Sequence, residues 1–535
     1  MNEQQTSRLN ALFAPYTQPG RPGVVVGIAQ HGKTLYREAF GLANVEHRVA
    51  MTPTTRVAIC SVTKHITCAS VLQLASEGRL DIDAPIGRWI PELAHAAQAP
   101  TLRQLMNHTG GSRCQLDVGA FNGVTPHPAG TPMRMLQRQR QLNFEPGDGQ
   151  MYSNGGYVLL SMAIERATGM PFGRYVEQAL FAPLRLDAST APSRWWPLPQ
   201  GAATFYMPHE GGVWRHGIGF EEETLGGGCV ISSVDDMLRW AAHLRCSRGP
   251  VSLDSLTATK QGHDDFLHGI YRFGLTDSRW RDQRLVEHSG GAVGASCHLL
   301  IAPEAELELF VFFNSMEPAQ SLARQAAAIV LEDRLAPEPA MPAPRAERYP
   351  DLLGQYIDEE QGLTIGFGEL PDGGLGVSIL GGAFVPALQG HAPSRDELPF
   401  HVPTAVGPRY FRREPIQGAL QWLEAGRWRT LRMMTSSMPT AQAMASALGD
   451  ATYVSDEAGA KLQFRLEGEK LKLRSWGEFG VWDFPLQTLA SDLLSFGFYE
   501  GSPSWLARLH AKGGRVESID MNSTRTRGLR FERQS

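Results

Sequence analysis

The stretch RVAICSVTK, from Arg56 to Lys64, leads a strand-like apolar run directly into the start of a helical pattern. It places Ser61 and Lys64 three residues apart, and on a helix such residues share one face, so the hydroxyl and the amine can meet. The free N–H groups and the positive dipole end of a helix N-terminus stabilise negative charge that develops beside Ser61. Ser-x-x-Lys also arises by chance about once or twice in a chain of this length, so an N-cap serine with a surface lysine is the alternative. The stretch predicts a catalytic serine with a lysine partner if other segments join it.

A second stretch, FEPGDGQMYSNGGY over residues 144–157, is a turn-rich loop that enters a helical pattern. A phenol close to an ammonium group has its ionised form favoured, so Tyr152 beside Lys64 is expected to act as a base well below its free pKa of about 10. Asn154, two residues further on, is a candidate for binding substrate. In the alternative, Tyr152 packs under the loop and Asn154 caps the helix.

The third stretch, His288-Ser289-Gly290-Gly291, comes just before a pair of predicted strands. Glycines in or beside a strand allow a substrate backbone to approach closely. The N–H of Gly291 could join that of Ser61 in an oxyanion hole, and His288 and Gly290 would line the same place. The alternative for His288 is a satisfied or exposed histidine at a strand end.

Taken together, Ser-x-x-Lys, Tyr-x-Asn and His-x-Gly have the order and approximate spacing of the penicillin-recognising serine hydrolases, and the chain resembles this family through residues 20–330. The resemblance implies a β-lactamase/transpeptidase-like catalytic domain. No match to the deacylating glutamate of class A β-lactamases is found, so Tyr152 with Lys64 resembles the base system of class C enzymes. His288 stands where the family usually has lysine, and a largely neutral histidine makes substrates recognised by a free carboxylate less expected.

The nucleophile segment, residues 56–69, is similar to that of the bacterial D-aminopeptidases of this family. That resemblance implies a substrate with a free amino group, either a small peptide or an amino-acid amide, and a homodimer as one expectation. It also implies that a loop of the last domain, residues 475–484, enters the active site. The residues that would line the cleft there are Trp476, Glu478, Trp482 and Asp483. A hairpin turn with solvated acids is the alternative, and Glu221-Glu222-Glu223 is a second acidic candidate that fits a solvated face better.

A chain of 535 residues is expected to divide into two or three domains. Residues 24–36 and 296–314 predict hairpins that flank helical patterns at 64–77 and 157–168, which is typical of a mixed antiparallel sheet covered by helices. The expected fold is multidomain α+β, with a β-lactamase-like catalytic domain followed by two small antiparallel β-barrels. The predicted boundaries are a catalytic domain at 1–334, a proline-rich linker at 335–350, a first barrel at 351–434, a linker at 435–450 and a second barrel at 451–535.

Composition narrows the possible partners. Fifty basic against 55 acidic residues give a net charge of -5, which supplies no attraction for nucleic acid or for an anionic membrane. The first residues lack a cationic, apolar leader, and no apolar run reaches 18 residues. Six cysteines in so long a chain do not form a disulfide framework, so a cytoplasmic location is expected. No motif requires a metal or another cofactor.

The predicted function is that of a serine hydrolase that forms an acyl-enzyme on Ser61 and releases N-terminal D-amino acids from peptides, amides and esters. The preference for D-residues follows from the resemblance only. One alternative is a carboxylesterase or a β-lactamase-like hydrolase of the same fold. Another is a penicillin- or peptide-binding protein without turnover.

Overall fold

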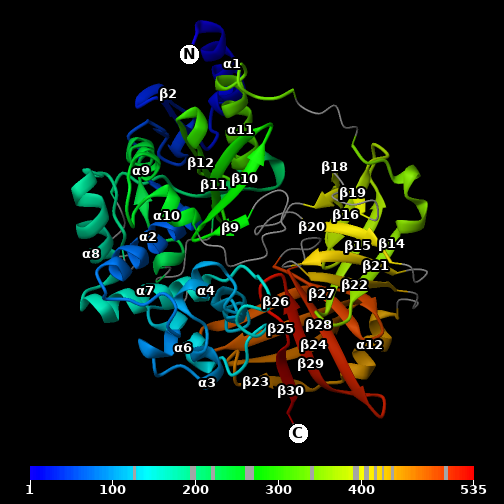
Figure 1. Cartoon of the computed structure of the whole chain (residues 1–535). Helices are drawn as coiled ribbons and strands as arrows, with labels where there is room; N and C mark the ends of the chain where they lie inside the picture. Colours follow the sequence, from blue (N-terminus) through cyan, green and yellow to red (C-terminus); the bar gives the residue numbers. More distant parts are fainter. Residues whose placement is uncertain are drawn as a thin grey trace.

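A computed structural model describes the chain except for residues 124–127, 193–199, 218–222, 224, 259–269, 338–342, 390–396, 403–408, 415–418, 425–426, 435–438, 499–503 and 535. A mixed helix and sheet unit occupies the first 330 residues, and two antiparallel β units follow (Figure 1). This arrangement confirms the predicted fold class. No helix in the described ranges has the length and apolar character needed to cross a bilayer.

The first unit is built on a seven-stranded antiparallel sheet with the order β2-β1-β13-β12-β11-β10-β9. The hairpin predicted at 24–36 is confirmed, because Val24 pairs with Phe40 and the turn at His31 and Gly32 has positive φ. The hairpin predicted at 296–314 is confirmed as well. The strands are β1 (Val24–Gln30), β2 (Lys33–Phe40), β9 (Ile270–Arg272), β10 (Leu275–Trp280), β11 (Gln283–Ala292), β12 (Ala295–Ala302) and β13 (Leu307–Phe313).

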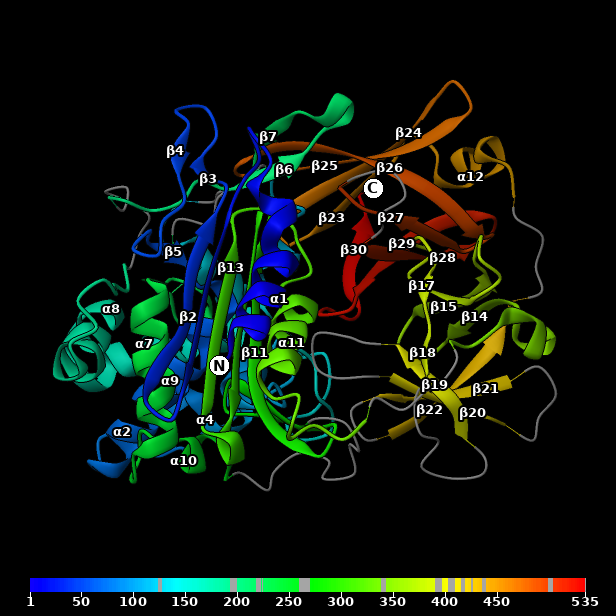
Figure 2. The same ribbon diagram turned by 90° about the horizontal axis from the view of Figure 1, so that it is seen from above.

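The two faces of this sheet are covered by different helices. Alternate residues of one strand point to opposite faces, so Val24 and Val26 belong to one core and Val25 to the other. Helices α1 (Glu3–Phe13) and α11 (Ala319–Val330) cover the first face, where Leu9 and Leu322 pack, and they lie side by side in Figure 2. Helices α2 (Thr63–Ser76), α7 (Asn154–Thr168) and α9 (Val234–Cys246) build the second, larger core.

Short elements complete the first unit. Its remaining helices are α3 (His95–Gln98), α4 (Leu102–Met106), α5 (Gln115–Gly119), α6 (Thr131–Arg138), α8 (Phe172–Val176) and α10 (Leu253–Thr257). Three two-stranded ribbons join β3 (Leu42–Asn44) to β4 (Val49–Ala50), β5 (Val57–Ala58) to β8 (Ile231–Ser232), and β6 (Tyr206–Pro208) to β7 (Trp214–His216). The β5–β8 ribbon fixes the backbone just before Ser61.

The second unit is a nine-stranded antiparallel sheet with the order β17-β16-β15-β14-β22-β21-β20-β19-β18. Its two edge strands are separated in sequence by Ala387 alone, so the sheet curls until it is nearly closed. The strands are β14 (Gly354–Asp358), β15 (Leu363–Glu369), β16 (Leu375–Ile379), β17 (Val385–Pro386), β18 (Leu388–Gln389), β19 (Glu397–Val402), β20 (Arg409–Arg413), β21 (Ala419–Glu424) and β22 (Arg427–Met433).

The third unit is a closed barrel, in which β30 returns to pair with β23 and leaves no sheet edge. The stretch expected to be a linker at 435–450 contains helix α12 (Ala441–Leu448), whose Met444 and Leu448 are buried in the barrel core. The strands are β23 (Thr452–Ser455), β24 (Ala460–Glu467), β25 (Lys470–Gly477), β26 (Gly480–Ala490), β27 (Leu493–Phe496), β28 (Trp505–Lys512), β29 (Arg515–Ser523) and β30 (Leu529–Arg533).

The barrel is joined to the first unit, which we call the catalytic unit, by an aromatic side chain that inserts into the barrel core. Phe121, fully buried, belongs to the barrel core, and its ring centre lies 4.7 Å from that of Trp505 and 5.4 Å from that of Phe531. The buried Arg113 adds an ion pair with Glu457 of the barrel. The barrel therefore packs against the segment of the first unit that follows α4 in the chain and contains Arg113 and Phe121.

Candidate active site

Ser61 lies in the single helical turn Cys60–Val62 that leads into α2, and it is partly exposed. The ammonium nitrogen of Lys64, on the first turn of α2, is 3.1 Å from the Ser61 Oγ. Lys64 is completely buried and also donates to the Asn154 Oδ1 and to the carbonyl of Gly227, both at 2.7 Å. Three acceptors therefore hold the lysine against the serine hydroxyl.

Burial lowers the pKa of Lys64 to about 7, and the positive charge of Arg525 acts in the same direction. An amine with such a pKa is largely neutral slightly above pH 7, so its lone pair can accept a proton. This is the protonation state that a base next to Ser61 needs.

Tyr152 completes the group. It is hydrogen bonded to Ser61, and the centre of its ring lies 4.8 Å from the Lys64 Nζ. Burial nevertheless raises the pKa of Tyr152 well above its ordinary value, against the opposing effects of Ser61 and Arg525. This direction is opposite to the lowered pKa expected for Tyr152, because the cost of charging a buried phenol exceeds the attraction of nearby positive charge. The lowered pKa of Lys64 favours it as the base, with Tyr152 as a hydrogen-bond partner of Ser61.

Asn154 is not the cap of its helix, because Ser153 takes that position and accepts from the N–H of Gly156. The side chain of Asn154 is instead free to bind Lys64. Its Nδ2 lies 3.8 Å from the sulfur of Cys114, so Asn154 connects the lysine to the segment before α5.

The His-x-Gly stretch forms part of β11 and lies against the nucleophile turn. A Cβ on Gly290 would lie 2.4 Å from the carbonyl oxygen of Ile59, so only glycine allows this close approach. Gly291 is exposed at the same end of the strand, where a Cβ would meet nothing closer than the Ala295 carbonyl oxygen at 3.7 Å. These contacts bring this end of β11 against the turn that carries Ser61.

His288 is buried and neutral. Its Nε2 accepts from the Tyr271 hydroxyl at 3.1 Å, and its Nδ1 faces the carbonyl of Ser289 at 2.5 Å. Burial and then the charge of Lys64 lower the pKa of His288 to about 3. The strand therefore offers no cation where the family usually has lysine.

Sequence reasoning assigned no role to His108, which holds Tyr152 in place. The two ring centres are 4.3 Å apart, and the His108 Nδ1 accepts from the backbone N–H of Ser153 at 3.1 Å. Burial keeps the pKa of His108 well below its ordinary value, so the ring is neutral. The stretch NHTGG at 107–111 contributed to the family resemblance, but nothing in it predicts that His108 contacts Tyr152.

The hairpin at 475–484 docks on the catalytic unit by its tip. The N–H groups of Glu478 and Phe479 donate to the side chain and the carbonyl of Asn122 at 2.7 and 3.0 Å. The Glu478 carboxylate lies 3.4 Å from the Arg134 guanidinium. The tip therefore contacts residues near α5 and α6.

The other side chains expected in the cleft belong to the barrel. Asp483 forms a two-point ion pair with Arg474 on the neighbouring strand, and the Trp482 ring packs 5.2 Å from that of Phe498. Trp476 is half-buried in β25. Among the described residues, no hydrogen bond or ion pair joins this hairpin to Ser61, Lys64 or Tyr152.

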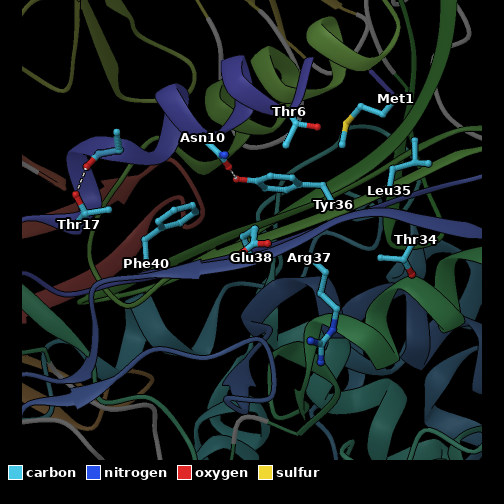
Figure 3. A pocket seen from close by; sticks show the side chains of 11 residues that line it. Met1, Thr6, Asn10, Thr17, Thr34, Leu35, Tyr36, Arg37, Glu38 and Phe40 are labelled. Carbon is cyan, nitrogen blue, oxygen red and sulfur yellow. Dashed lines mark hydrogen bonds between the residues drawn. The ribbon is translucent and has the colours of Figure 1, made fainter. Parts of the chain in front are cut away.

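The acidic stretch at 221–223 adds little. Glu221 and Glu222 lie outside the described residues, and the carboxylate of Glu223 accepts from the backbone N–H of Gly130 at 2.6 Å. A surface groove of about 690 Å³ between α1 and β2 (Figure 3) is lined by residues from the first 17 positions and from β2, and it contains none of the predicted site residues. The described part of the chain shows no cluster of three or more His, Cys, Asp or Glu side chains suited to a metal ion.

Arg525 is the residue that the sequence did not reveal. It comes from the loop between β29 and β30 of the barrel, and its charge lowers the pKa of both Lys64 and Tyr152. Its carbonyl accepts from the N–H of Cys114, and its guanidinium pairs with Asp117. The barrel thus contributes a charged side chain to the surroundings of the nucleophile from the loop between β29 and β30.

Residues 9–334 match the family model described as "Beta-lactamase". A D-aminopeptidase of Gluconobacter oxydans is 27% identical over 386 residues, which are 70% of each chain. A D-aminopeptidase of Brucella ovis is 26% identical over 361 residues, which are 64% of this chain and 65% of that one, slightly under two thirds of its length.

Two solved structures extend the comparison. An octameric penicillin-binding protein homologue from Pyrococcus abyssi superposes with a TM-score of 0.55 at 18% identity and covers 99% of both chains. A D-amino acid amidase from Ochrobactrum anthropi, complexed with D-phenylalanine, has a TM-score of 0.53 at 21% identity and covers 62% of this chain and 100% of its own. At these identities the likeness concerns the fold.

Proposed function

This chain belongs to the beta-lactamase family, and from that premise we propose that it is a serine hydrolase that releases N-terminal D-amino acids from peptides and amides. The observation that carries the proposal is the contact of 3.1 Å between the Ser61 Oγ and a buried Lys64 whose pKa is lowered to about 7. The relatives named D-aminopeptidase support the stereochemical preference.

In the first step the Ser61 Oγ attacks the carbonyl carbon of the D-residue while neutral Lys64 accepts the hydroxyl proton. The backbone N–H groups of Ser61 and Gly291 stabilise the oxyanion. As the C–N bond breaks, the proton passes from Lys64 to the leaving amine, with the Tyr152 hydroxyl as the neighbouring hydrogen-bond partner. The products are an ester on Ser61 and a free amine.

In the second step water attacks the ester carbonyl, and Lys64 accepts a proton from it. The bond between the acyl carbon and the Ser61 oxygen then breaks, and the proton returns to Ser61. The D-amino acid leaves as its carboxylic acid, which releases its proton to solvent, and the enzyme returns to its starting state.

The test is Ser61→Ala with D-alanine p-nitroanilide as substrate. Turnover should be lost while the far-UV circular dichroism spectrum stays that of the wild type. A variant that keeps most of its rate would refute the mechanism. Rates on D- and L-alaninamide, on a short ester and on a chromogenic cephalosporin separate the D-aminopeptidase from an esterase, from a β-lactamase and from a binding protein that is acylated once without turnover.

We also propose a cytoplasmic enzyme that forms a homodimer. Six unpaired cysteines, five of them buried, support a reducing compartment. A relative described as octameric supports self-association in this fold. Light scattering coupled to size exclusion distinguishes a dimer from a monomer and from a larger assembly.

A further inference from the structure

The loop between β29 and β30 brings a cation to the nucleophile from the far end of the chain. The Arg525 carbonyl accepts from the Cys114 N–H at 3.4 Å and from the Asn143 Nδ2 at 3.1 Å. Cys114 in turn contacts Asn154, the residue that holds Lys64. Only these two residues, Cys114 and Asn154, therefore separate the backbone of Arg525 from the catalytic lysine.

The guanidinium of Arg525 is held on one side only. Its Nη2 pairs with Asp117, which is 5% exposed and also accepts from the Ser523 hydroxyl. About a third of the Arg525 side chain, 34%, remains exposed. Within the described part of the chain, neither Nε nor Nη1 donates to a side chain or a carbonyl. A buried carboxylate thus fixes the direction of the guanidinium, while Nε and Nη1 keep N–H groups that can donate to a ligand.

We propose that Arg525 binds a carboxylate of the substrate beside the nucleophile. The inference rests on the proposed function and names the class of substrate that this function takes. A guanidinium is permanently charged and donates strong, charge-assisted hydrogen bonds to carboxylate oxygens. His288 is neutral where the family usually has lysine, so Arg525 supplies from the barrel the positive charge that β11 lacks.

This assignment reverses the expectation that substrates with a free carboxylate are disfavoured. That expectation considered only the His-x-Gly strand. The hairpin expected to supply acidic groups for a substrate ammonium keeps Asp483 and Glu478 paired with Arg474 and Arg134. Among the described residues, no carboxylate contacts Ser61, Lys64 or Tyr152, whereas the field of one cation reaches both Lys64 and Tyr152.

The carboxylate can belong to either part of the substrate, and two matched pairs distinguish the sources. D-alanyl-glycine and D-alanyl-glycinamide differ only in the charge at the end of the leaving group. D-aspartyl and D-asparaginyl p-nitroanilide differ only in the charge of the D-residue. We expect the wild type to prefer the acid over its amide in one of the two pairs, by about 10- to 100-fold in kcat/KM and mainly through KM.

Three variants test the residue. Arg525→Gln should reduce the preference to about one. Arg525→Lys should keep a part of it, because the charge remains but the planar set of guanidinium donors is lost. Arg530→Gln, five residues further along and paired with Asp520 on the barrel surface, should keep the wild-type preference. Removing the charge of Arg525 also raises the pKa of Lys64, but this effect is common to both members of a pair and cancels in their ratio.

Two results would overturn the proposal: a wild type without preference in either pair, or an Arg525→Gln variant with the wild-type ratio. If the single variant does not fold because Asp117 loses its partner, the double variant Asp117→Asn/Arg525→Gln replaces it. If the wild type hydrolyses the amides in a Ser61-dependent manner but shows no preference, only the role of Arg525 fails. If no D-substrate is hydrolysed, the proposed function fails, and calorimetric binding of D-alanyl-glycine against its amide then decides on Arg525.

Discussion

Replacing Asn154 with aspartate is expected to move the pH dependence of catalysis upward by about two units. The two side chains have nearly the same shape, so the variant introduces a negative charge 2.7 Å from the Lys64 Nζ with little change in packing. At an effective dielectric constant near 20, two unit charges at this separation attract by about 6 kcal/mol. The cost of burying the new carboxylate cancels a large part of that attraction, which leaves a shift of about two pKa units.

The sign of the effect follows from the role of Lys64 as a base. In the wild type a pKa of about 7 leaves roughly half of the lysine neutral at pH 7. A pKa near 9 would leave about 1% neutral, so kcat/KM at pH 7 should fall about fiftyfold. Most of the rate should return at pH 10, because the lysine is again neutral there.

The assay is kcat/KM for D-alanine p-nitroanilide between pH 5 and 10.5. Asn154→Ala is the matched control, since it removes the hydrogen bond without adding charge and should leave the acid limb at or below pH 7. If Asn154→Asp shows an acid limb unchanged from the wild type and keeps its rate at pH 7, Lys64 is not the base in the free enzyme.

Further predictions concern stability and the two contacts that position the site. The pKa of Lys64 is about 7 in the folded protein and about 10.4 in the unfolded chain, so folding releases a proton between these pH values. Relative to Lys64→Met, the free energy of unfolding of the wild type, measured in urea, should therefore rise by about 2 kcal/mol from pH 7 to 9. A difference between the two proteins that stays constant over this range would contradict the assigned pKa. Gly290→Ala, whose Cβ would lie 2.4 Å from the Ile59 carbonyl oxygen, should lower kcat/KM at least about 100-fold with an unchanged circular dichroism spectrum, whereas Gly291→Ala, which keeps its N–H, should stay within about tenfold. Phe121→Ala removes the side chain that fills the barrel core and should lower the free energy of unfolding by about 3 to 5 kcal/mol. Calorimetry should show the barrel transition at a lower temperature. A melting profile identical to that of the wild type would show that Phe121 does not stabilise the barrel.

The fold was largely predictable because its signals are local. Alternating apolar residues and turn residues predicted the strands at 24–36 and 296–314, and helical spacing predicted α2 and α7 to within a few residues. The contact between Ser61 and Lys64 follows from three-residue spacing on one helix, so it too could be predicted. Tyr152 lies next to Lys64, but burial raises its pKa where the sequence suggested a lowered one, because the depth of burial depends on neighbours from several segments.

The contribution of the barrel was harder to predict. Arg525 meets Asp117 across 408 residues of sequence, and nothing in the local pattern around either residue marks the contact. The hairpin at 475–484 has the more conspicuous aromatic and acidic composition, which favoured it as the loop that enters the site. Its tip does dock on the catalytic unit, yet the loop that approaches the nucleophile is the inconspicuous one at 523–528, because its backbone packs against Cys114 and Asn143.

The pairing of β30 with β23 has a consequence for how the protein is made. The barrel closes only when its last strand, Leu529–Arg533, has left the ribosome. At about 5 to 20 residues per second, the 201 residues from 335 to 535 take about 10 to 40 s to translate after the catalytic unit is complete. During that interval the Phe121 side chain has no barrel core to enter and Asp117 has no guanidinium partner, so a nascent chain carries its nucleophile before it carries the arginine that selects the substrate.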